Sequence, residues 1–124
     1  MDLNMKTVVL GASSNTSRTS YLATVRLRDN GIQTFPVGIK SGKIEELDIL
    51  IDQPHIEDVH TITLYVGTAR QAPLYDYIFS LDPKRIIFNP GTENYELKRL
   101  AEAKGIEAIN ACTLVMLSLD NYSG

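Results

Sequence analysis

Short apolar runs alternate with segments of helical periodicity along this chain. The runs cover Thr7–Leu10, Gln33–Val37, Thr61–Val66, Arg85–Phe88 and Ile106–Ile109. Several are almost continuous in apolar or β-branched residues, which is typical of strands buried on both faces of a parallel sheet. The alternation predicts an α/β fold: a single Rossmann-like, doubly wound domain over residues 1–124, with a mainly parallel sheet of about five strands.

The helices are predicted from apolar spacing and from signals at their ends. We expect them at residues 17–29, 70–81 and 93–104, the second becoming regular near Pro73, because proline is tolerated only in a first turn. Their apolar stripes are Leu22, Val25 and Leu27; Leu74, Tyr77, Ile78 and Leu81; and Leu97, Leu100 and Ala101. The tail from Cys112 to Leu119 fits either a last helix or a strand.

Residues 38–58 are the least regular part of the pattern. They are predicted to form a loop that contains a short apolar run, Leu47–Ile51, and a turn at Gln53-Pro54. The acidic pairs Glu45-Glu46 and Glu57-Asp58 in this region are interpreted as solvated loop charges and not as a two-carboxylate active site.

The composition of the chain argues against three classes of function: nucleic-acid binding, metal binding and membrane association. The chain has 124 residues, enough for one core, and a net charge of −3, which gives no general attraction to nucleic acid. One cysteine, Cys112, and two separated histidines, His55 and His60, form no recognisable metal-ligand set, so we expect no metal site. With no leader-like segment and no apolar run long enough to span a bilayer, the chain is expected to be cytoplasmic, without a membrane partner.

The segments that follow the predicted strands are rich in glycine, hydroxyl and amide groups. In an open parallel sheet these segments meet at the carboxyl edge, where ligands bind. The first of them, GASSNTSRTS at residues 11–20, follows a strand without a spacer and contains one cation, Arg18. Three interpretations compete: a helix cap, a phosphate cradle and a surface linker. We favour a cradle that also caps the helix, because capping alone needs only one such residue.

The motif does not match the common nucleotide-binding loops. It is not GxxxxGK[ST], and of the glycines in GxGxxG only Gly11 is present. A site for NAD would also place an acid near the end of the second strand, where this chain has Lys40 and Lys43 nearby. A cation there favours a ligand with a phosphate on or near its ribose, such as NADP or coenzyme A (CoA).

Five segments together resemble the small stand-alone CoA-binding proteins and, more distantly, the CoA-binding Rossmann domain of succinyl-CoA synthetase α subunits and acyl-CoA synthetases. The segments are TVVLGASSNTSRTSYLA at 7–23, PVG at 36–38, TLYVGTARQAPLYDYI at 63–78, RIIFNPGTEN at 85–94 and ACTLVML at 111–117. Only residues 39–60 match poorly. The resemblance implies that CoA or an acyl-CoA lies along the carboxyl edge of the sheet.

The resemblance also implies a role for each matched position. The phosphates would be held by Gly11, Ala12, Ser13, Ser14, Asn15, Ser17 and Arg18. Pro36, Val37 and Lys40 would face the adenosine and its ribose phosphate, Tyr65, Val66 and Gly67 would line the pyrophosphate and pantetheine side, and Asn89, Pro90 and Gly91 would form the floor beneath the thiol-bearing arm. Gly38 and Cys112 are further candidate binding residues. The chain departs from related patterns at Thr16, where proline is frequent, and at Ile39, where a basic residue is expected. The second departure leaves open whether Lys40 or Lys43 meets the ribose phosphate.

No catalytic constellation is recognisable. His55 and His60 lie in or beside the poorly matched region, and Cys112 is either a small buried residue or a thiol able to form a mixed disulfide with CoA. We therefore predict a CoA-binding protein without catalysis of its own. The alternatives are a small NADP-dependent oxidoreductase or redox sensor, and a ligand-free module that binds a protein partner. Replacing Gly11 with valine is expected to block phosphate approach and leave the fold intact.

Overall fold

A computed structural model describes residues 5–123 and confirms the α/β prediction. The strands of the main sheet are β1 (Thr7–Leu10), β2 (Thr34–Val37), β5 (Thr61–Leu64), β6 (Arg85–Phe88) and β7 (Glu107–Asn110). The helices are α1 (Thr19–Asp29), α2 (Tyr75–Ser80), α3 (Tyr95–Ala103) and α4 (Thr113–Ser118), with two 3₁₀ turns, η1 (Thr68–Arg70) and η2 (Ala72–Leu74), before α2. The tail is thus a helix, and α2 becomes regular just after Pro73.

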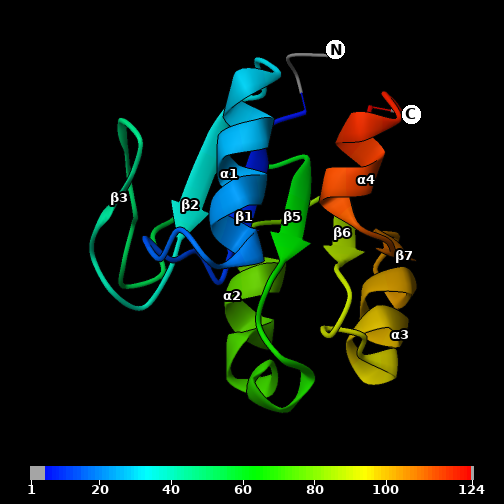
Figure 1. Ribbon diagram of the computed structural model, residues 1–124. Coiled ribbons are helices and arrows are strands. Elements are labelled where there is room, and N and C mark those ends of the chain that lie inside the picture. The colour runs from blue at the N-terminus through cyan, green and yellow to red at the C-terminus, as the bar shows by residue number, and fades with distance from the viewer. Residues whose placement is uncertain (1–4, 124) are drawn as a thin grey trace.

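All neighbouring strands of the main sheet are parallel, in the order β2-β1-β5-β6-β7. Their arrowheads point the same way in Figure 1. The chain moves outward from β1 to β2, then returns to the other side of β1 and continues from β5 to β7. The order therefore reverses between β1 and β5. In doubly wound sheets the loops after these two strands diverge and leave a crevice for a ligand.

The sheet separates two apolar cores. Val8, Ile62 and Ile86 belong to the core on one face, which includes residues of α2 and α3; Val9 and Ile87 belong to the other, which includes residues of α1 and α4. Strands β1, β5 and β6 are buried along their whole length, which explains their nearly continuous apolar sequence.

Two helices bury different residues from those that the spacing predicts. In α1, Leu22 is exposed whereas Ser20 and Thr24 are buried, and the Thr24 hydroxyl donates a hydrogen bond to the Ser20 carbonyl at 2.8 Å. That local bond satisfies a hydroxyl that is fully buried. In α3, Leu97 and Ala101 are buried as expected, but Leu100 is exposed.

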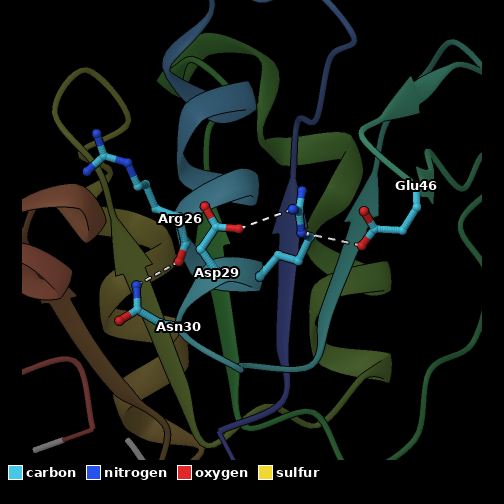
Figure 2. A network of polar contacts seen from close by, with 5 residues as sticks. Arg26, Asp29, Asn30 and Glu46 are labelled. Atoms are coloured by element: carbon cyan, nitrogen blue, oxygen red, sulfur yellow. Dashed lines mark hydrogen bonds and ion pairs between the residues drawn. The ribbon is translucent and has the colours of Figure 1, made fainter.

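Residues 38–58 contain more structure than a loop. The short strands β3 (Lys43–Ile44) and β4 (Leu47–Asp48) form an antiparallel hairpin, and Leu50 extends the edge of β2 through a parallel bridge to Val37. Arg28 connects the end of α1 to this hairpin, with ion pairs to Asp29 at 3.2 Å and Glu46 at 3.4 Å (Figure 2). The second ion pair thereby ties the turn of the hairpin to the C-terminal end of α1, beside the edge strand β2.

Candidate functional site

A cleft of about 1450 Å³ lies at the carboxyl edge of the sheet, where the strand order reverses. Its walls come from the loops after β1, β2, β5 and β6 and from Cys112, which precedes α4. The sequence-based prediction that these loops converge is therefore confirmed in the geometry of the chain. The volume exceeds the range of about 300–1,000 Å³ that is usual for drug-sized ligands, so the cleft has room for an extended ligand.

Close backbone contacts form the floor of the cleft. Gly11 has a φ of +98°, and a Cβ built on it would lie 2.9 Å from the carbonyl carbon and oxygen of Tyr65. A Cβ on Gly38 would lie 2.5 Å from the carbonyl oxygen of Ala12. Both glycines are thus required by packing between the loops of the protein itself. The expectation that a valine at Gly11 would leave the fold intact is wrong for this reason.

The loop after β1 is organised by its own side chains. The Asn15 carboxamide oxygen accepts hydrogen bonds from the Ser17 amide at 3.0 Å and the Ser17 hydroxyl at 2.7 Å, and the Ser13 hydroxyl accepts one from the Asn15 amide at 3.1 Å. These bonds hold the loop together but do not cap α1.

Helix α1 begins later than predicted and has no side-chain cap. Its N-cap residue is Arg18, and no side chain accepts a hydrogen bond from its first turn. Thr19 and Ser20, the first two residues of the helix, line the cleft. The prediction that a side chain of the loop at residues 11–20 caps the helix is therefore wrong. The open N-terminus presents unpaired amides and a partial positive charge toward the cleft.

Positive side chains predominate in the cleft although the chain is acidic. Arg18, Lys40 and Arg70 line it, whereas Asp52 is the one carboxylate among the described lining residues. None of these four side chains makes a hydrogen bond or ion pair within residues 5–123. An excess of unpaired cations beside an uncapped helix N-terminus is suited to an anionic ligand with more than one charge.

Lys43 is engaged elsewhere. Its ammonium group donates to the Asp48 carboxylate at 2.7 Å within the β3–β4 hairpin, and it does not line the cleft. The sequence left open which of Lys40 and Lys43 meets a phosphate. In the structure Lys40 lines the cleft and has no ion pair, so it is the one available to an anionic ligand.

Asn89 supports the other end of the cleft. Its carboxamide is buried and donates to the Thr63 hydroxyl at 2.7 Å and the Leu64 carbonyl at 2.9 Å, while its oxygen accepts from the Thr113 amide at 2.9 Å. The side chain thus joins β6 to β5 and to the first turn of α4. Since both its donors and its acceptor are occupied, Asn89 shapes the floor of the cleft through Pro90 and Gly91 and not through its own amide.

Tyr65 and Cys112 lie at this end too. Burial raises the pKa of Tyr65 to about 12, with a partial offset from the nearby Thr113 and Thr63 hydroxyls. Those two hydroxyls bond each other at 2.7 Å, and the buried Tyr65 hydroxyl has no hydrogen-bond partner in the described part of the chain. Cys112 is a partly buried free thiol on the cleft wall. In residues 5–123 no cluster of three or more histidine, cysteine or acidic side chains is positioned to hold a metal ion.

Comparison with known proteins decides the family. The model of the CoA-binding domain family matches residues 5–118. This chain belongs to the CoA-binding domain family. No curated protein matches it significantly. The cations, the uncapped helix and the volume of the cleft suit a ligand with a diphosphate and a long pantetheine arm, so the residues present fit CoA.

Solved structures share the fold of this CoA-binding domain. One, described as an uncharacterized protein, is 47% identical, with 95% of this chain and 98% of that chain covered and a TM-score of 0.93. A conserved hypothetical protein from Pyrococcus furiosus is 25% identical, covering 89% and 97%, with a TM-score of 0.77. A hypothetical protein from Pyrococcus horikoshii OT3 is 19% identical, covering 93% and 82%, with a TM-score of 0.81, and shows the fold alone.

Most residues expected to contact CoA do line the cleft. They are Gly11, Ala12, Ser13, Ser14, Ser17, Arg18, Val37, Gly38, Lys40, Tyr65, Val66, Gly67, Asn89, Pro90, Gly91 and Cys112. Two do not: Asn15 organises the loop after β1, and Pro36 lies along β2, where it lines a separate hollow with Thr34 and Phe35. Residues in the cleft that sequence reasoning missed include Ile39, Asp52, Gln53 and Arg70. No periodic pattern marks these four, because they are brought to the cleft by turns.

Proposed function

We propose that this CoA-binding domain holds CoA or an acyl-CoA along the carboxyl edge of its sheet and does not itself catalyse a reaction. The observation that carries the proposal is that two unpaired cations, Arg18 and Lys40, line one cleft together with the uncapped N-terminus of α1. Helix N-termini and arginines bind phosphate oxygens through oriented N–H groups and charge. The family match supports CoA as the source of those phosphates.

In this proposal the loop after β1 binds the diphosphate. The first amides of α1 and the Arg18 guanidinium lie on the same side of the switch point, next to the position where the backbone of Gly11 contacts Tyr65. Lys40, which follows β2, binds the ribose phosphate. Ile39 is 91% exposed on the cleft wall and offers an apolar surface to the adenine.

The pantetheine arm then runs past Tyr65 and Gly67 toward Pro90, Gly91 and Cys112. Gly67 leaves space on the cleft wall, since a Cβ there would have only the Arg70 guanidinium within 4 Å, at 3.9 Å. Gly91 is equally open, with nothing within 4 Å of its Cβ position. A thin, flexible arm fits such a wall without displacing backbone.

The absence of catalysis is proposed because the described residues that line the cleft include no paired acid and base. Asn89 is fully hydrogen-bonded to the protein, and the raised pKa of Tyr65 keeps its hydroxyl protonated near neutral pH. Asp52 is the one carboxylate to test, since a carboxylate that lines the cleft can accept a hydrogen bond from a ribose hydroxyl. That observation keeps the NAD-type and NADP-type ligands of an oxidoreductase as the second candidate.

The decisive experiment measures the melting temperature of ligand-free protein against CoA, acetyl-CoA, NADP and NAD. A ligand that binds only the folded state stabilises it by RT ln(1 + [L]/Kd), about 2.7 kcal/mol at a hundredfold excess over Kd. A concentration-dependent rise with CoA but not NAD is expected. A rise with NADP alone would support an oxidoreductase. No rise with any of them, in protein shown by native mass spectrometry to carry no ligand, would support a protein-interaction module.

A further inference from the structure

The cations of the cleft lie on two sides of the switch point. Arg18 and Lys40 follow β1 and β2, whereas Arg70 ends the η1 turn that follows β5. In the sheet order β2-β1-β5-β6, the first two strands lie on one side of the reversal and the last two on the other. Arg70 is therefore the one cation on the β5–β6 side among the described residues that line the cleft.

The backbone on both sides of Arg70 is firmly held. The side-chain amide of the buried Gln71 donates to the Val66 carbonyl at 2.8 Å and the Thr92 carbonyl at 2.7 Å. The Thr68 hydroxyl donates to the Glu93 carbonyl at 2.7 Å. These bonds fix the η1 turn to the loop after β6. The Arg70 guanidinium itself is free of hydrogen bonds and ion pairs within residues 5–123, and it lies next to Gly67 on the cleft wall.

The phosphates of CoA do not account for Arg70. In the binding mode proposed above, Arg18 and the N-terminus of α1 hold the diphosphate and Lys40 holds the ribose phosphate, all on the β1–β2 side. The part of the ligand that reaches the β5–β6 side is the uncharged pantetheine arm and the acyl group on its thiol. Arg70 is exposed, and its guanidinium has no partner in residues 5–123, so it is available at this end for a negative charge on the acyl group.

We propose that Arg70 binds a carboxylate at the end of the acyl group, so that the site fits the CoA thioester of a dicarboxylic acid. This inference rests on the proposed function. The planar guanidinium presents paired N–H groups that match the two oxygens of a carboxylate. Pro73 and Leu74, which also line the cleft, offer apolar contact to the methylenes between the thioester and the carboxylate.

The test compares thioesters that differ only in the terminal group. Calorimetric affinities are measured for malonyl-, succinyl- and glutaryl-CoA, each against the neutral isostere in which two methyls replace the carboxylate oxygens: isovaleryl-, isocaproyl- and isoheptanoyl-CoA. At the chain length that fits, the carboxylate member should bind roughly tenfold or more tightly, the factor expected of a charge-assisted hydrogen bond. Arg70→Gln should remove this preference and change the affinity for unacylated CoA by less than about twofold.

A matched control is Arg26→Gln. Arg26 is exposed on α1 outside the cleft, so this variant makes the same change in net charge and should keep the preference. Arg70→Lys should retain part of it. Equal affinity within all three pairs in the unmodified protein overturns the inference while CoA binding still stands. An equal loss of affinity for CoA and for every thioester in Arg70→Gln also overturns it, and assigns Arg70 to a phosphate. If CoA itself does not bind, the proposed function fails first.

Discussion

The backbone of Gly11 lies against the carbonyl group of Tyr65, so close that a Cβ on the glycine would stand 2.9 Å from both carbonyl atoms. This contact joins the loops after β1 and β5 at the point where the strand order reverses. The sequence predicts that Gly11 leaves space for a phosphate. In the structure Gly11 also leaves space for the loop after β5. A substitution at Gly11 is therefore expected to destabilise the fold itself, in addition to any effect on ligand binding.

Glycines at two positions of the cleft should accordingly respond differently. Gly11→Ala combines a positive φ with a backbone clash and should lower the free energy of unfolding by about 2 kcal/mol or more.

Gly67 has an ordinary backbone conformation, with φ −56° and ψ 147°, and an open Cβ position. Gly67→Val should therefore fold normally and weaken CoA binding by about 1–3 kcal/mol through steric overlap. Urea unfolding without ligand and calorimetric CoA titration separate the two effects. Full stability in Gly11→Ala would contradict the packing argument.

Removal of the Asn89 carboxamide should destabilise the fold itself. Asn89→Ala leaves the Thr113 amide without its acceptor and deprives the buried Leu64 carbonyl of a donor, at about 1–3 kcal/mol for each buried group left unpaired. Urea unfolding should show the loss in the absence of any ligand. Asn110→Ala, at an exposed position, is the control and should stay within about 0.5 kcal/mol of the parent. A loss of CoA affinity with unchanged stability would instead place Asn89 in direct contact with the ligand.

Burial of Tyr65 predicts a loss of stability at alkaline pH. Its pKa is raised from 10.0 to about 12 in the folded protein, so above pH 10 the unfolded chain releases the proton before the folded chain does. The free energy of unfolding should fall between about pH 10 and 12, by roughly 2–3 kcal/mol from this group. Burial raises the pKa of Tyr122 as well, so it adds to the fall.

The variant Tyr65→Phe isolates that contribution. It should reduce the alkaline slope in urea unfolding and cost little at neutral pH, because the hydroxyl it removes is buried without a partner. Tyr122→Phe removes a hydroxyl that bonds Thr7 at 2.7 Å, so it should be destabilising already at pH 7. An unchanged slope in Tyr65→Phe would show that its ionisation is not coupled to folding.

Cys112 provides a chemical footprint of the thiol end of the site. It is the single cysteine of the chain and lines the cleft, so a thiol reagent reports on this position alone. Saturating CoA should slow its modification at least about tenfold if the pantetheine arm covers it, because a site occupied nine-tenths of the time is open one-tenth of it. The readout is the rate of iodoacetamide labelling by mass spectrometry, with Cys112→Ser as the blank. Equal rates with and without CoA would place the arm elsewhere.

Arg18 is expected to contribute to the salt dependence of the affinity for CoA. Arg18→Gln is expected to weaken CoA binding by about 1–2 kcal/mol, a value reduced by the exposure of the guanidinium to water. The affinity of the variant should also fall less steeply with added salt, because one charge contact is missing. Calorimetry at several salt concentrations measures both effects, and Arg26→Gln serves again as the control for net charge. Equal salt slopes in parent and variant would remove Arg18 from the phosphate site.

Among residues 5–123, no helix is long and apolar enough to cross a membrane.

The amino-acid sequence by itself determined the strands, the parallel α/β architecture and the polar edge, because local patterns encode them. After their first residues, the strands Thr7–Leu10 and Arg85–Phe88 are apolar, because both faces of these strands are covered, and that burial leaves a signature in consecutive residues. The glycine and hydroxyl residues of GASSNTSRTS, residues 11–20, likewise predict a loop at the end of a strand, and most residues of this segment line the cleft.

Tertiary structure alone decided which polar groups are free. Nothing near Lys43 in sequence distinguishes it from Lys40, yet Lys43 is paired with Asp48 across a hairpin while Lys40 faces the cleft. Asn89 is fully used by partners that are 24 to 26 residues distant in sequence. Arg70 reaches the site only because Gln71 fixes its turn to the loop after β6. The availability of a side chain depends on which distant segments fold against it, and no local pattern contains that information.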